Sequence, residues 1–203
     1  MAGTITAICF GVFFVVESFH SRAMVEIYEM KSSNVGLTFV VLGFGSAAGN
    51  FSGGHLADFL SRRSRDKSGA TLPEARLRGV WACTLILMLG MLVYGWSLET
   101  KQPIWVPLVG MWILGFGYTS SCIGATSYFV ELVPNYASSV SAATSILRMG
   151  LATLFSSSGS VVIEYLGYGK GSTLYAAISL ISILLTILLL LKGPAIRAKT
   201  GPH

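Results

Sequence analysis

Six apolar segments dominate the chain and restrict what it can fold into. They cover about residues 4–24, 35–60, 80–97, 104–130, 137–163 and 173–191. A helix of about 17–25 apolar residues crosses a bilayer core, and every segment reaches that length. Charged residues make up only 11% of the chain, against about 25% in soluble domains. The sequence therefore predicts an all-α integral membrane protein, with six transmembrane helices in one unit over residues 1–203.

The basic residues outside these segments are unevenly distributed between the connecting loops. The loop 61–79 holds Arg62, Arg63, Arg65, Lys67, Arg76 and Arg78, and the tail 192–203 holds Lys192, Arg197 and Lys199. The loops on the other side together hold Arg22, Lys31, Lys101 and Lys170. Positively charged loops stay in the cytosol, so the loop 61–79, the tail and both termini are predicted to be cytosolic. The net charge of +5 then reflects orientation, and no nucleic-acid partner is expected.

The second segment carries a ladder of small residues. Gly45, Gly49 and Gly53 recur every four residues and so share one helical stripe. Glycines in that pattern let the backbones of two membrane helices approach closely. Asn50 lies within the ladder and could bond to another helix or touch a substrate. We predict that this stripe packs against a neighbouring helix.

The ladder ends in a dense group of charges. Gly54 and Asp58 stand at the predicted membrane edge, and Arg62 and Arg63 follow one turn later. A charge at such a depth usually has a partner. We predict a gating element here, with Glu131 at the cytosolic end of the fourth segment as a salt-bridge partner. The alternative is an ordinary basic anchor, which explains the arginines but not Asp58.

Two charges lie deep inside the predicted spans. Counted at about 1.5 Å per residue, Glu17 is roughly 20 Å and Arg148 roughly 18 Å from the cytosolic starts of their segments. An unpaired charge there costs at least about 3 kcal/mol, so a pair or a polar cavity is expected. Alternatively, the first segment ends early and Glu17 lies at the outer interface with His20 and Arg22. His20 is either a proton-coupling residue or an interfacial one.

The remaining predictions concern Tyr118, the sixth segment and the three cysteines. Tyr118 is too central for the aromatic belt at the membrane surface, so we predict that it lines a cavity. The stretch Ser179–Leu191 of the sixth segment has no ionisable group and is expected to face lipid. Cys9, Cys83 and Cys122 lie inside apolar segments without metal-ligand spacing. No set of residues predicts catalysis, so the chain is not expected to be an enzyme or to use a metal or cofactor.

The charged motif resembles a known signature. The pattern Gly54-x-x-x-Asp58-x-x-Ser61-Arg62-Arg63 is similar to the G-x-x-x-D-[RK]-x-G-[RK]-[RK] motif of the major facilitator superfamily, with Phe59 and Ser61 as departures. Three further stretches resemble the C-terminal half of fungal drug:proton antiporters: residues 127–134, 137–148 and 192–197. Glu26-Ile-Tyr28 also resembles the outer end of the seventh helix of those proteins.

The resemblance implies that the chain corresponds to helices seven to twelve of a twelve-helix transporter. Such proteins rock two halves around a central site. By resemblance, the chain would export small organic molecules such as drugs or secondary metabolites, coupled to protons, from the plasma membrane. Asp58 with Arg62 and Arg63 would latch the cytosolic gate, and Arg148 would lie against that latch or beside the cavity.

One six-helix half cannot enclose a cavity from both sides. The predicted partners are therefore the lipid bilayer, a small-molecule substrate, protons, and either a missing N-terminal six-helix half or a second copy of this chain. The alternative function is a truncated membrane half that does not transport, or that acts as a scaffold.

Overall fold

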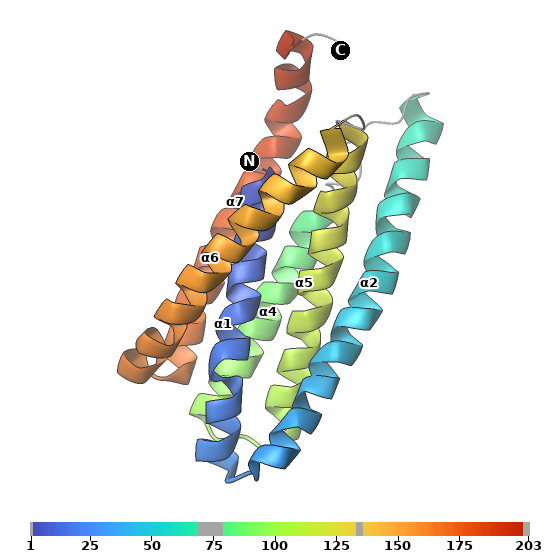
Figure 1. Cartoon of the computed structure of the whole chain (residues 1–203). Helices are drawn as coiled ribbons and strands as arrows, with labels where there is room; N and C mark the ends of the chain where they lie inside the picture. The colour runs from blue at the N-terminus through green and yellow to red at the C-terminus, as the bar shows by residue number, and fades with distance from the viewer. Residues whose placement is uncertain (1, 69–78, 133–135, 201–203) are drawn as a thin grey trace.

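A computed structural model describes residues 2–68, 79–132 and 136–200 (Figure 1). Within these ranges the chain forms helices and no strand. The helices are α1 (Ala2–Tyr28), α2 (Ser32–Ser68), α4 (Val80–Glu99), α5 (Trp105–Leu132), α6 (Ala137–Leu166) and α7 (Tyr168–Thr200). Each contains a stretch long and apolar enough to cross a membrane. The predicted all-α fold with six transmembrane helices is confirmed.

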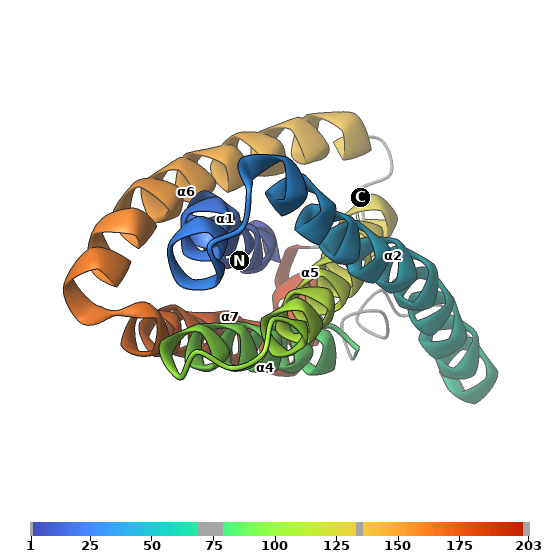
Figure 2. The same ribbon diagram turned by 90° about the horizontal axis from the view of Figure 1, so that it is seen from below.

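The helices run alternately up and down, so the chain has two distinct ends (Figure 1). The terminal end carries the start of α1 and the end of α7. The turn end carries the connections from α1 to α2, from α4 to α5 and from α6 to α7. In cross-section, α2 packs along α5, α6 packs along α1, and α4 packs against both α5 and α7 (Figure 2). Among the described residues α2 and α6 do not touch each other.

Burial differs sharply between these helices. Of the most apolar stretch of α1, 67% is buried, against 28% for α2 and 17% for α6. The core is built from side chains such as Val12, Val16, Leu87, Met91 and Leu114, which come from α1, α4 and α5. The helices α2 and α6 therefore rest on the core with one face each and leave their other faces open.

Two helices extend beyond the predicted segments. At the terminal end α2 continues past Leu60 to Ser68, so the first part of the expected loop 61–79 is helical; residues 69–78 lie outside the described part. Residues 61–68 contain neither proline nor glycine, so the helix does not stop where the apolar run ends. Similarly, α7 continues through Thr200 into the expected tail 192–203.

At the turn end α7 begins at Tyr168, earlier than residue 173, in a glycine-rich stretch that resembles a loop. Gly167 has a φ of +84°, which allows the chain to reverse directly after α6. The Glu99 carboxylate of α4 then accepts a hydrogen bond from the Gly169 N–H at 3.1 Å. A carboxylate at this position satisfies a free amide and suits the positive end of the helix dipole. This cap explains the early start of α7.

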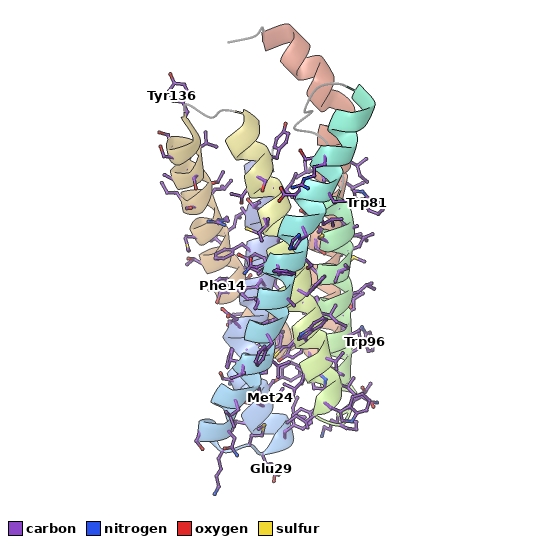
Figure 3. All side chains as sticks on the ribbon, turned by 90° about the vertical axis from the view of Figure 1, so that its right-hand side faces the viewer. Phe14, Met24, Glu29, Trp81, Trp96 and Tyr136 are labelled. Atoms are coloured by element: carbon purple, nitrogen blue, oxygen red, sulfur yellow. The ribbon has the colours of Figure 1, made fainter. Side chains whose placement is uncertain are left out.

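Exposed aromatic side chains mark both ends of the bundle (Figure 3). Trp81 and Trp96 lie on the outer side of α4, and are 41% and 50% exposed. They are separated by fifteen residues, roughly 22 Å along a helix. Tyr136 at the terminal end and Trp105 near the turn end are each 65% exposed. Tryptophan and tyrosine favour the two membrane–water interfaces, so their positions fit a protein that crosses the bilayer with its ends at the surfaces.

Candidate functional site

Arg148 lies on α6 and directs its guanidinium group toward α1 and α5. Its Nη1 donates to the Cys122 Sγ of α5 at 3.4 Å, and its Nη2 donates to the Ser145 Oγ at 3.1 Å. The guanidinium carbon is 5.5 Å from the centre of the Phe10 ring of α1. The Nε atom is buried and has no hydrogen-bond partner among the described residues. A permanently charged group is thus held inside the span by weak partners.

The Phe10 ring beside this cation belongs to a group of aromatic side chains. Tyr118 of α5 is half-buried and stacks on Phe13 of α1, with ring centres 4.5 Å apart and an angle of 27° between the planes. Its ring centre is also 5.7 Å from that of Phe10. We refer to Arg148, Cys122, Tyr118, Phe10 and Phe13 together as the Arg148 site. It combines one positive charge with an aromatic wall, and Tyr118 belongs to it.

Glu17 does not pair with Arg148. It lies half-buried on α1, seven residues beyond Phe10 toward the turn end, or roughly 10 Å along the helix. Glu17 makes no hydrogen bond or ion pair with another described residue. The similar depths predicted for Glu17 and Arg148 assumed that α1 and α6 begin at the same level. In the structure Gly3 of α1 lies level with Thr144 of α6, so the two helices are offset. The alternative of an early end is also not observed, since α1 continues to Tyr28.

His20 is fully buried and connects three helices near the turn end. Its Nδ1 is 2.8 Å from the Tyr94 hydroxyl of α4, and its Nε2 is 2.6 Å from the Thr38 hydroxyl of α2. The Thr38 hydroxyl donates to the Val35 carbonyl at 2.6 Å, so its oxygen accepts from Nε2–H. The Tyr94 hydroxyl then donates to Nδ1. A neutral imidazole satisfies both contacts, and we refer to His20, Tyr94 and Thr38 as the His20 clamp.

The glycine ladder of α2 lies directly against α5. A Cβ at Gly45 would collide with the Trp112 carbonyl, and one at Gly53 would lie 2.7 Å from the Ser120 Cα. A Cβ at Gly49 would lie 2.5 Å from the Phe116 carbonyl oxygen. These three positions therefore require the absence of a side chain.

Hydroxyl groups of α5 strengthen the same seam. Thr119 donates to the Ser46 carbonyl at 3.0 Å, and Ser120 donates to the Gly49 carbonyl at 2.9 Å. Sequence reasoning did not single out these hydroxyls, because the spacing of the glycines does not say which helix faces them. Asn50 lies on the exposed side of α2 and makes no hydrogen bond with another described residue.

The predicted gate motif lies on the terminal part of α2. Asp58 and Arg62 are both exposed and one turn apart, so they share a face of the helix. Gly54 has open space where a Cβ would stand, unlike its neighbour Gly53. The side chains of Arg63 and Glu131 lie outside the described ones, so the predicted contact with Glu131 stays a prediction.

The expectation that the sixth segment faces lipid is wrong for one side of α7. Ser172, Ser179, Ser182 and Thr186 are all fully buried. Their spacing of seven, three and four residues places them on one helical face. Ser182 is 3.4 Å from the Cys9 Sγ of α1, within a buried polar cluster that also includes Thr84 and Ser121. The helical spacing of these hydroxyls was the signal that could have revealed this inner face.

Helices and site together define a multi-pass membrane protein with a charged, aromatic-lined position inside one six-helix unit. No family model matches the sequence. The chain is, however, 31% identical over 84% of its length to the MFS-type transporter penM of Penicillium rubens, covering 34% of that protein. It is 31% identical over 89% of its length to the probable efflux pump mfs2 of Aspergillus flavus, covering 43% of it. For the efflux pump radE of Floropilus chiversii, the identity is 26% over 92% of the chain and 35% of the pump.

The chain thus spans about a third to two fifths of the length of these curated relatives. Its similarity to them extends over most of its own sequence, and its helices fit half of a major facilitator fold. The chain is thus similar to a portion of fungal MFS-type transporters and efflux pumps, and its helices are consistent with half of a major facilitator fold.

Proposed function

We propose that this chain is one six-helix half of a secondary transporter, which exports small organic molecules by alternating access. The observation that carries the proposal is the Arg148 site, because a charge inside a span marks a substrate or ion pathway. Two relatives are named efflux pumps, which favours export. In this proposal the chain binds and moves its substrate without catalysing a reaction, and without a metal or cofactor.

The cavity of such a transporter would be completed by a second six-helix unit. The open faces of α2 and α6 are suited to receive it, either as an N-terminal half or as a second copy. We assign residues 1–203 to one transmembrane half with a cytosolic loop and tail. The terminal end would face the cytosol because Arg62, Arg63, Arg65 and Lys67 lie on the last turns of α2 at that end. Proton coupling and location in the plasma membrane complete the proposal. Glu17 is the ionisable group of α1 that we propose for proton transfer, because His20 is already hydrogen-bonded at both ring nitrogens.

Reconstitution tests the function directly. The chain would be purified in mild detergent, its oligomeric mass measured, and its flux of two dyes, cationic rhodamine 6G and anionic fluorescein, followed in proteoliposomes under a proton gradient. A second sample would contain the chain together with any six-span segment that genomic DNA encodes in frame upstream of Met1. Movement of either dye in either sample supports the proposal. A folded, assembled protein that moves neither dye in both samples would overturn it and favour a scaffold.

The gate assignment predicts the effect of Asp58→Asn in the transporting sample. Removing the charge should unlatch the cytosolic gate and lower dye export about fivefold or more, the range of a typical coupling between two states. The membrane yield of the protein should not change. Glu164→Gln, which removes an exposed carboxylate on α6 near the turn end, is the matched control and should leave export intact. Unchanged export by the Asp58→Asn variant would remove Asp58 from the gate.

A further inference from the structure

We propose that the Arg148 site binds organic anions, with the carboxylate or a similar oxyanion on Arg148 and an aromatic body against the rings of Phe10, Phe13 and Tyr118. This inference rests on the proposed function, since the bound anion would be the class of molecule that the transporter moves. Its basis is a cation that has no counter-ion among the described residues and lies against an aromatic ring.

The site carries a positive charge that no described group neutralises. An arginine is always protonated in proteins, so the site carries a full positive charge. Its neighbours are a thiol, a hydroxyl and a ring face, and no described carboxylate contacts it. Glu17 lies roughly 10 Å further along α1. The positive charge is therefore left for a ligand to neutralise.

The geometry of the Arg148 guanidinium group suits a carboxylate. A carboxylate binds arginine best through two parallel N–H groups. The edge formed by Nε and Nη2 has only one partner, the Ser145 hydroxyl on the adjacent turn, and Nε has none among the described residues. The two N–H groups of that edge can donate to both oxygens of a carboxylate once Ser145 is displaced. Because Nε is buried, binding requires Arg148 or α6 to shift. The packing of α6 restrains such a shift little, since only 17% of its apolar stretch is buried.

The aromatic side chains of the site suit a ligand with an aromatic body. Tyr118 stacks on Phe13 with ring centres 4.5 Å apart, and it lies tilted to Phe10 at 5.7 Å. Planar rings join such stacks at offset or edge-on angles. An apolar wall offers nothing to a strongly hydrated inorganic ion, so the site selects an anion with an aromatic body. A lipid phosphate is a poor candidate, because Arg148 is ten residues inside α6 from Ser138, roughly 15 Å along the helix.

A small pocket among the described residues lies elsewhere. It is lined by residues of α2, α4 and α5, including Gly53, Ala57, Val80 and Cys83. Its walls carry no charged group, so it does not provide an alternative anion site. The Arg148 site is instead formed where α1, α5 and α6 meet, and a second six-helix unit would have to close it. A carboxylate supplied by that unit is the competing occupant.

The test uses the full chain in lipid nanodiscs and exploits Cys122, whose thiol touches Arg148. Alkylation of Cys122 by N-ethylmaleimide would be followed by peptide mass spectrometry, with 2-naphthoate or its neutral analogue 2-naphthamide present. We expect saturable protection by naphthoate and none by naphthamide. Binding of radiolabelled naphthoate to the same samples gives a second readout that does not depend on thiol reactivity.

Variants then assign the binding to the charge. Arg148→Gln should weaken naphthoate binding roughly tenfold to a hundredfold, as expected for loss of charge-assisted hydrogen bonds. Arg148→Lys keeps the charge but loses the paired N–H groups, so its naphthoate binding should fall between that of the parent chain and that of Arg148→Gln. Arg22→Gln, at an exposed arginine paired with Glu26, is the control and should bind like the parent chain. Each variant is compared with its own rate without ligand.

Three results with the chain alone would overturn the inference. They are equal binding of acid and amide, no naphthoate binding, and binding that survives in Arg148→Gln. Loss of binding when the second unit assembles would show a structural ion pair instead of a substrate site. The two proposals fail separately: naphthoate binding without dye flux removes the transport function, and rhodamine flux without naphthoate binding removes only the anion site.

Discussion

The His20 clamp and the Arg148 site are two polar positions inside the same bundle, and they differ in how completely their hydrogen bonds are satisfied. Both ring nitrogens of His20 have short, well-placed partners on two other helices. Arg148 has a thiol, one hydroxyl and a ring face, and its Nε has no described partner. One position is closed and the other is incomplete.

This difference separates a structural role from a functional one. A fully connected buried network fixes the relative positions of the helices that it joins. An incompletely satisfied charge costs free energy in the isolated unit, and such costs persist where another molecule or subunit will offset them. We therefore interpret the turn end as the fixed end of this half, and the Arg148 site as the part that needs an occupant.

The largest expected effect is on the closed position. His20→Ala removes two hydrogen bonds and leaves a cavity between α1, α2 and α4, so it should lower the free energy of unfolding by about 2–3 kcal/mol. Unfolding by sodium dodecyl sulfate in mixed micelles measures this. Substitution of exposed Arg22 by alanine controls for a general effect on α1. A loss no larger than that of the control would mean that His20 is not a clamp.

A change of opposite sign is expected at the incomplete position. Arg148→Met keeps a long side chain but removes the unsatisfied charge, and should raise the free energy of unfolding of the chain alone by about 1–2 kcal/mol. The same titration measures it, together with naphthoate binding, which should disappear. Destabilisation by this variant would show that Arg148 is already satisfied and would weaken the contrast with His20.

The smallest effect tests the clamp more finely. Tyr94→Phe removes only the hydroxyl that donates to His20 Nδ1 and preserves the ring. Hydrogen bonds between membrane helices average about 0.6 kcal/mol, so a loss of about 0.5–1 kcal/mol is expected from the same titration. Tyr165→Phe, at an exposed tyrosine of α6, should have no effect. A silent Tyr94→Phe variant would reduce the clamp to its contact with Thr38.

The sequence predicted the helices and the chemical character of the site better than its contacts. The length and apolar composition of the segments give the six helices, and the four-residue spacing of Gly45, Gly49 and Gly53 predicts a packing stripe. The partner helix of that stripe depends on how the helices are arranged, so Thr119 and Ser120 were not found. The helical spacing of the serine and threonine residues of α7 predicts a buried hydroxyl face. We considered only the composition of that segment, which suggested a helix that faces lipid.

Depth was the least reliable inference, and Glu17 and Arg148 show why. Counting residues from the start of each segment assumes that all helices begin at one level and run parallel. In the structure Gly3 faces Thr144, and Gly11 faces Phe155, so α6 starts several residues before it meets α1. The interfacial interpretation of His20 placed it too near the end of the first helix. In the structure α1 continues to Tyr28, so His20 lies about two turns inside its end.

The glycine seam between α2 and α5 also constrains how this sequence can change. Where two backbones touch, even an added methyl group must displace a carbonyl or an α-carbon, which cannot move as a side chain can. Substitution at Gly45, Gly49 or Gly53 would thus be tolerated only if α5 changed with it, whereas Asn50 and the other exposed positions of α2 are free of this restraint. One face of the helix is held almost invariant by its neighbour, and the opposite face is left to diversify.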